Sequence, residues 1–154
     1  ALEYASDSLK ADREVVLEAV KQDGNALEYA SDSLKADREV VLEAVKNLGQ
    51  KLWHERRYDA FEYASDSLKA DREVVLEVVK LDGDVLQEVS KELQNDKDIV
   101  MAAVKHSGNA LEYASKNLKN DKEVVLEAVK SDERAIAFAS KNLKSDKDIK
   151  SVIS

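Results

Sequence analysis

The 154-residue sequence contains no cysteine, no proline and only four glycines. The absence of cysteine excludes a disulfide scaffold, a thiolate metal site and a cysteine nucleophile. Because glycine and proline supply most turn conformations, their scarcity argues against an all-β protein. No apolar run approaches the roughly 18 residues of a membrane span, and no signal-peptide pattern opens the chain. The sequence is 44% apolar and 36% charged, and it is long enough to bury a sizeable core.

Basic residues are fewer than acidic ones, and the formal net charge is −8. The net charge is −4 over residues 1–59, −5 over 60–109 and +1 over 110–154. An acidic chain is a poor partner for nucleic acid or for an anionic membrane surface. We therefore expect another protein as the partner, no nucleic acid, no membrane span and a cytoplasmic location.

An internal repeat dominates what the sequence does contain. Residues 1–21 read ALEYASDSLKADREVVLEAVK, and residues 26–46 repeat them letter for letter. Alignment of the remaining chain gives a 25-residue period that is broken once, by a nine-residue insertion in the second repeat. A fixed period of this length is typical of stacked supersecondary units. The six repeats are residues 1–25, 26–59, 60–84, 85–109, 110–134 and 135–154.

Each repeat predicts two short helices joined by a turn. Leu2, Ala5 and Leu9 have near-helical spacing, and Asp12 stands where an N-cap would begin the second helix. Gly24 is expected to end that helix in the left-handed conformation. Asn25 would then begin the next repeat through a capping box. The same features recur in the later repeats.

Helices of roughly nine residues are unstable alone in water, so each must bury its apolar face against a neighbouring repeat. We therefore predict an all-α fold, an α-solenoid (superhelical array) of about six 25-residue helix-turn-helix repeats in one domain over residues 1–154. One position is leucine in all six repeats and should lie in the core: Leu9, Leu34, Leu68, Leu93, Leu118 and Leu143.

The repeated motif A-L-E-Y-A-S-x-x-L-K-x-D-R/K-E/D-V-V-L-E-A-V-K-x-x-G covers nearly the whole chain. It resembles the tandem helical repeats of the family known as domain of unknown function forty-one-sixteen. The chain departs from the pattern in its insertion and at Glu88, where the five other repeats have tyrosine or phenylalanine. The resemblance implies a helical repeat fold, and it implies no activity, catalytic residue or cofactor.

Catalytic and metal-binding patterns are missing from the sequence. The two histidines, His54 and His106, belong to no HExxH motif, and no P-loop, GxGxxG or GxSxG pattern is present. We expect His106 in a surface loop. A column of aspartates could bind cations along one edge, but each stands where a helix needs a cap: Asp12, Asp37, Asp71, Asp96, Asp121 and Asp146. We therefore expect no enzyme, no cofactor and no metal.

A serine column follows the first predicted helix of every repeat: Ser6, Ser31, Ser65, Ser90, Ser115 and Ser140. Small size at a tight helix crossing, or a hydroxyl bond back to a carbonyl, would explain these serines.

The insertion is the feature that breaks the repeat symmetry. Between Lys46 and Ala60 the chain reads NLGQKLWHERRYD, and tryptophan, tyrosine and arginine are enriched at interface hot spots. Two interpretations stay open, since the segment could cover a widened gap between repeats or contact a partner. The candidate partner-binding residues here are Trp53, His54, Arg56, Arg57 and Tyr58.

An aromatic column gives a second candidate surface: Tyr4, Tyr29, Tyr63, Tyr113 and Phe138. These rings could form an interlayer stack with hydroxyls reaching solvent, or an aromatic stripe on a binding groove. Tyr29 and Tyr63 are the candidates that we assign to partner binding.

The leading functional interpretation is a non-enzymatic protein–protein interaction scaffold or adaptor. One alternative is a structural subunit of a larger complex, or a chain that associates end to end through its first repeat, which lacks a polar cap. Another is an engineered or recently duplicated array, because two repeats share 21 identical residues.

Overall fold

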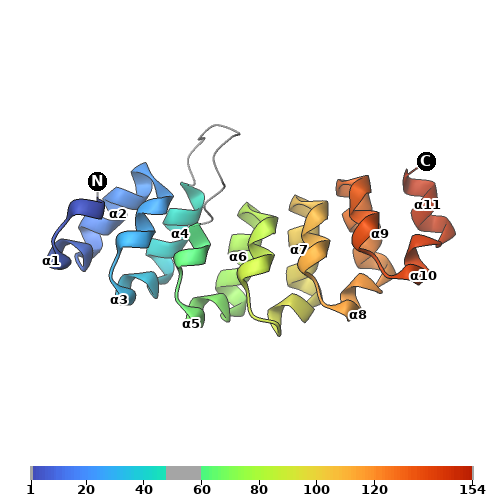
Figure 1. The fold of residues 1–154 in the computed structure, drawn as a ribbon, viewed down its shortest axis with the longest axis horizontal. Helices are drawn as coiled ribbons and strands as arrows, with labels where there is room; N and C mark the ends of the chain where they lie inside the picture. Colours follow the sequence, from blue (N-terminus) through green and yellow to red (C-terminus); the bar gives the residue numbers. More distant parts are fainter. Residues whose placement is uncertain (1, 48–59, 154) are drawn as a thin grey trace. The chain divides into compact units, whose positions relative to one another are not determined.

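A computed structural model describes residues 2–47 and 60–153 (Figure 1). The chain forms two compact units, Ala1–Val74 (unit 1) and Val75–Ser154 (unit 2), and the division falls inside helix α6. All regular elements of the described residues are α-helices or 3-10 helices. The all-α repeat fold is therefore confirmed, whereas a single superhelical domain over residues 1–154 stays a prediction. None of the described helices is long and apolar enough to cross a membrane.

Unit 1 runs from the first 3-10 helix into the start of α6. Its elements are η1 (Leu2–Tyr4), α1 (Asp7–Lys10), α2 (Arg13–Gln22), η2 (Gly24–Tyr29), α3 (Asp32–Lys35), α4 (Arg38–Lys46), η3 (Ala60–Tyr63), α5 (Asp66–Lys69) and α6 (Arg72–Leu81).

Unit 2 continues from α6 to the last helix. Its further elements are η4 (Gly83–Glu88), η5 (Leu93–Asn95), α7 (Lys97–His106), η6 (Gly108–Tyr113), α8 (Lys116–Lys119), α9 (Lys122–Ser131), η7 (Glu133–Phe138), α10 (Lys141–Lys144) and α11 (Lys147–Ile153).

A repeat has three helical pieces, so the prediction of two helices was wrong in this respect. In the second repeat these are η2, the one-turn helix α3 and the long helix α4. The break falls at the serine column, because Ser31 is extended at φ −62° and ψ 157°. Most of these serines begin a helix, as when Ser6 Oγ accepts from Leu9 N at 3.3 Å. The hydroxyl thus accepts from an amide ahead of it, and the predicted bond back to a carbonyl was wrong.

The aspartate column caps the long helices, as predicted. Asp12 Oδ1 accepts from the amides of Glu14 and Val15 at 3.0 and 3.2 Å, which satisfies two N–H groups without a partner in the helix. The same acceptor role is found at Asp37, Asp71, Asp96, Asp121 and Asp146.

Gly24 has a role that the sequence did not indicate. No described residue has a positive φ, so the predicted left-handed helix end was wrong. Gly24 begins η2, and a Cβ there would lie 2.0 Å from the carbonyl oxygen of Ala44 in α4. The capping box at Asn25 was also wrong, because Asp23 caps η2 by accepting from Asn25 N at 3.1 Å. Glycine is required for the close approach of a 3-10 helix to a long helix.

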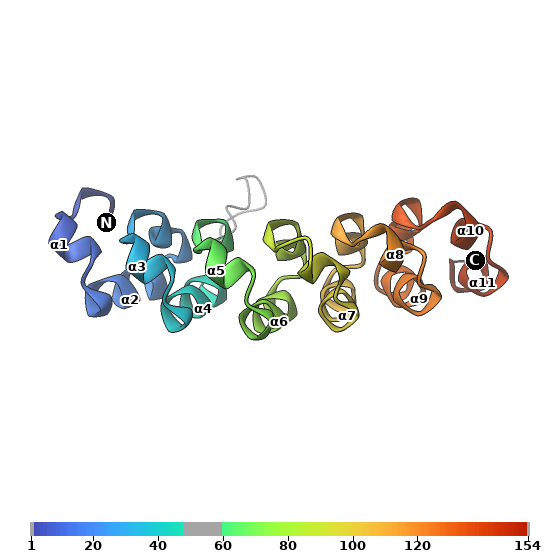
Figure 2. The same cartoon turned by 90° about the horizontal axis from the view of Figure 1, so that it is seen from below.

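Within each unit the long helices form one layer and the 3-10 helices another, with the one-turn helices linking them (Figure 2). In unit 1, α2 contacts α4 and both contact η2; in unit 2, α7 and α9 contact each other and η6. Buried valines such as Val16 and Val41 fill the space between the layers. The leucine column is buried from the second repeat onward, whereas Leu9 is 44% exposed.

Main-chain hydrogen bonds join neighbouring repeats inside each unit. The amide of Ser31 donates to the carbonyl oxygen of Lys10 at 2.9 Å, and Ser65 donates to Lys35 at the same distance. In unit 2, Ser115 donates to Gln94 and Ser140 to Lys119, again at 2.9 Å. The serine column therefore provides both a helix cap and a junction between repeats.

Candidate functional site

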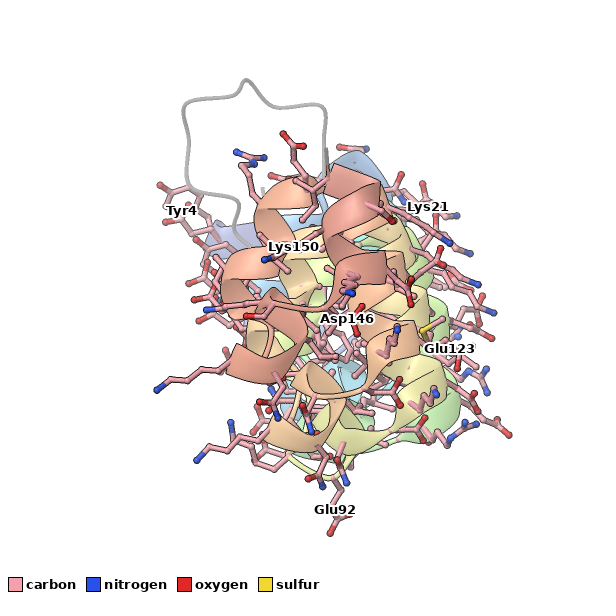
Figure 3. The ribbon with its side chains drawn as sticks, turned by 90° about the vertical axis from the view of Figure 1, so that its right-hand side faces the viewer. Tyr4, Lys21, Glu92, Glu123, Asp146 and Lys150 are labelled. Atoms are coloured by element: carbon pink, nitrogen blue, oxygen red, sulfur yellow. The ribbon has the colours of Figure 1, made fainter. Side chains whose placement is uncertain are left out.

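Three tyrosines of the aromatic column lie on one surface of unit 1. Tyr4, Tyr29 and Tyr63 are the last residues of η1, η2 and η3. Because η2 contacts both η1 and η3, these positions follow one another across the 3-10 layer. Tyr4 lies on the opposite side of unit 1 from Lys21 of the long-helix layer (Figure 3). We call Tyr4, Tyr29 and Tyr63 the tyrosine surface.

The tyrosine surface is aromatic and negatively charged. Tyr4 is 85% exposed, whereas Tyr29 and Tyr63 are half-buried. An exposed glutamate precedes each tyrosine, at positions 3, 28 and 62. Burial raises the pKa of Tyr29, and the nearby carboxylates of Glu28 and Glu3 raise it further. The Tyr29 hydroxyl therefore remains protonated at neutral pH.

The aromatic column is interrupted in unit 2. Glu88 ends η4 where a ring stands in the other repeats, and Tyr113 and Phe138 end η6 and η7. Burial, and then the carboxylates of Glu112, Asp84 and Glu88, raises the pKa of Tyr113. Within the described residues, unit 1 is therefore the part in which three successive repeats have tyrosine at this position.

The candidates in the insertion, Trp53, His54, Arg56, Arg57 and Tyr58, lie outside the described residues. Their assignment to partner binding stays a prediction. Tyr29 and Tyr63 are brought to the same surface, although their contact with a partner is untested.

His106 is exposed as predicted, but it ends α7 and is not in a loop. Its Nδ1 accepts from the amide of Gly83 at 3.1 Å, so the ring proton is on Nε2. Among residues 2–47 and 60–153, no three histidine, aspartate or glutamate side chains come close enough to hold a metal ion.

Ion pairs between repeats were missed by the sequence analysis. Arg13 Nε lies 2.9 Å from Asp37 Oδ2, and the same guanidinium contacts Glu39. In unit 2, Lys97 Nζ lies 3.0 Å from Asp121 Oδ2 and 2.7 Å from Glu123 Oε2. The recurring signal was a basic residue directly after each capping aspartate, but a 24-residue separation gave no reason to pair them.

These ion pairs change the acidity of the capping aspartates. The hydrogen bond from Arg13 lowers the pKa of Asp37, and bonds from the Val40 and Glu39 amides lower it further against the opposing effect of burial. The ionised form of the Asp37 side chain, which caps α4, is thus favoured at neutral pH.

Comparison with known proteins agrees with the repeat fold. The family model described as Domain of unknown function (DUF4116) matches residues 1–35, 12–69, 37–94, 71–119 and 121–150. The chain belongs to this family. No curated protein matches the chain. The search of solved structures also returned no match.

Proposed function

We propose that this chain is a non-enzymatic protein–protein interaction scaffold, or adaptor, that holds a partner on its tyrosine surface. The observation that carries the proposal is the exposure of Tyr4 beside two half-buried tyrosines on the same layer. Tyrosine provides a large contact area together with a hydroxyl, and it is enriched among residues that dominate binding energy. A core needs no ring that is 85% exposed, so Tyr4 is available for contact.

Charge indicates which partners this surface accepts. Glu3, Glu28 and Glu62 leave the tyrosine surface with an excess of negative charge. A partner with lysine or arginine could pair with these carboxylates and place a cation over a tyrosine ring. A basic protein segment is therefore the partner class that we expect at this surface.

The test is a pull-down from source-cell extract with the intact chain and with a Tyr4→Ala/Tyr29→Ala/Tyr63→Ala variant. Loss of hot-spot side chains should weaken retention of the partner by about tenfold or more. The matched control is Ser8→Ala/Ser33→Ala/Ser67→Ala, which changes exposed residues of the same three repeats. Thermal unfolding of both variants by circular dichroism separates lost contact from lost structure.

A third chain lacks residues 50–58, which restores the 25-residue period and removes the insertion candidates. A partner lost with this deletion alone would move the recognition site to the insertion. Partners retained by all three variants would contradict both assignments and favour the structural-subunit alternative.

A further inference from the structure

The long helices of unit 2 form a cleft of about 750 Å³ on α7, which we call the α7 cleft. Its apolar lining comes from the half-buried side chains of Leu76, Met101 and Ala102. Exposed polar side chains surround them, and Glu123 of α9 marks this face in Figure 3. The α7 cleft is thus a shallow apolar depression with a charged border.

The lining of the α7 cleft includes two adjacent positions at which the fourth repeat departs from the first, second, third and fifth. The column of Glu18, Glu43, Glu77 and Glu127 has Ala102 in this repeat, and the preceding leucine becomes Met101. Replacing a glutamate by alanine removes both the bulk and the charge that cover this part of the helix. Methionine adapts its shape readily to whatever contacts it.

The same departure removes the glutamate that stands three residues before a lysine in the first, second, third and fifth repeats. In the first repeat, Lys21 Nζ pairs with Glu18 Oε1 at 3.0 Å, three residues back in the helix. Lys105 occupies the position of Lys21, but alanine stands three residues before it. Lys105 is exposed on the border of the α7 cleft, and so is Lys80 of α6.

The remaining border groups are Lys97, Asp98, Glu123 and His106, and the first three bring one positive and two negative charges. Lys97 already pairs with Glu123 and Asp121, so the Glu123 carboxylate is compensated. His106 keeps its Nδ1 on the Gly83 amide, which leaves Nε2–H as a donor. With His106 neutral, the residues that line the α7 cleft carry a net charge of +1.

Unit 1 provides an internal comparison. A smaller cleft of about 440 Å³ on α4 is lined by Asp37, Arg38, Glu39, Leu42, Glu43 and Lys46. Its net charge is −1, and Glu43 occupies the position that Ala102 has in α7. The residues that line the two clefts thus carry net charges of opposite sign. Among the first five repeats the fourth is the one that lacks the glutamate, and the sixth has Val152 at this position.

We propose that the α7 cleft binds an acidic, amphipathic segment of a partner protein. An apolar side chain of that segment lies on Met101 and Leu76, and its carboxylates pair with Lys80 and Lys105. The apolar lining favours a peptide over a purely polar polyanion. This inference rests on the proposed scaffold function, and it names a second binding surface with a partner of opposite charge from the one expected at the tyrosine surface.

The test is selection of displayed random twelve-residue segments on the intact chain, followed by affinity measurement on variants. Met101→Leu/Ala102→Glu restores the Leu-Glu pair of four other repeats, so it should fold, and it should weaken cleft-dependent segments by about tenfold. Lys105→Glu should weaken the same segments. The control Lys141→Glu makes the same charge change on α10 and should alter affinity less than about twofold.

Segments lost with Met101→Leu/Ala102→Glu should be acidic and carry at least one apolar side chain. The proposal is overturned if no selected segment is sensitive to this variant, or if the sensitive ones are basic or uncharged. A single-stranded oligonucleotide that binds in their place would also overturn it. The triple tyrosine variant should retain these segments, so failure of the tyrosine surface and failure of the α7 cleft are separate results.

Discussion

Residues 1–21 and 26–46 have the same sequence and different environments. Leu9 is 44% exposed, whereas its equivalent Leu34 is 7% exposed. Tyr4 is exposed and Tyr29 half-buried, although both follow the same three residues. The second repeat contacts helices of the first and third repeats in unit 1, and the first contacts those of the second. Burial here is determined by neighbouring repeats and not by local sequence.

This difference makes the two repeats a matched pair for mutation. Helix propensity and unfolded-state effects are the same at equivalent positions, because the surrounding residues are identical. A difference in stability between equivalent substitutions therefore measures mainly the tertiary environment of the two repeats.

The largest effect is expected for Leu34→Ala. Removing a buried leucine loses transfer free energy and leaves a cavity, so the free energy of unfolding should fall by about 2–4 kcal/mol. The control Leu9→Ala should cost less than about 1 kcal/mol. Urea denaturation of the whole chain measures both. Equal losses would show that the two leucines have similar environments in solution.

A second, smaller loss is expected for Gly24→Ala, which tests the approach of η2 to α4. The new Cβ would meet the Ala44 carbonyl oxygen at 2.0 Å, so the helix must shift, at a cost of about 1–3 kcal/mol. Alanine is otherwise favourable where φ is not positive, so a net loss isolates the clash. Gln22→Ala, at an exposed neighbouring position, should stay within about 0.5 kcal/mol. A stabilised Gly24→Ala chain in urea denaturation would contradict the close approach.

The smallest effect is expected for Arg13→Ala, which removes the ion pair between the first two repeats. Both partners are partly exposed, so Tm should fall by only about 1–3 °C at neutral pH. Because Arg13 lowers the pKa of folded Asp37, this stabilisation is present above the unfolded pKa of about 3.9. It is lost as the pH falls through the folded pKa.

Melting curves between pH 2 and 7 should therefore show the Arg13→Ala chain converging with the intact chain at the acid end. Lys21→Ala breaks an ion pair within one helix and is the matched control. An Arg13→Ala deficit that is independent of pH would mean that Asp37 is not the partner that matters.

The sequence predicted the features that depend on residues close together in the chain. It missed the contacts between residues that lie far apart in the chain. The period, the aspartate caps and the leucine core follow from spacing within one repeat. Gly24 was interpreted as the end of a helix, because nothing in the local sequence indicated its contact with Ala44, which lies 20 residues further along the chain. Arg13 and Asp37 gave no pairing signal for the same reason.

Of the two candidate surfaces, one could be predicted from the sequence and the other could not. Tyrosines at one position of successive repeats must lie on one side if the repeats stack, so spacing predicted the tyrosine surface. The α7 cleft could not be predicted, because its lining comes from α6, α7 and α9, which are separated along the sequence. A small apolar residue in an apolar helix carries no signal until neighbouring helices define the space around it.

The serine junction has a consequence for how such a chain changes length. Each junction pairs one serine amide with one carbonyl, so a repeat that is copied whole brings its own donor and its own acceptor. The bond between Ser65 and Lys35 keeps its 2.9 Å length although nine extra residues separate this pair. Gain or loss of entire repeats therefore requires no new side chain at the joint, and insertions between joints leave the pairing intact. The number of repeats and the chemistry of their surface residues can therefore change independently in a chain joined in this way.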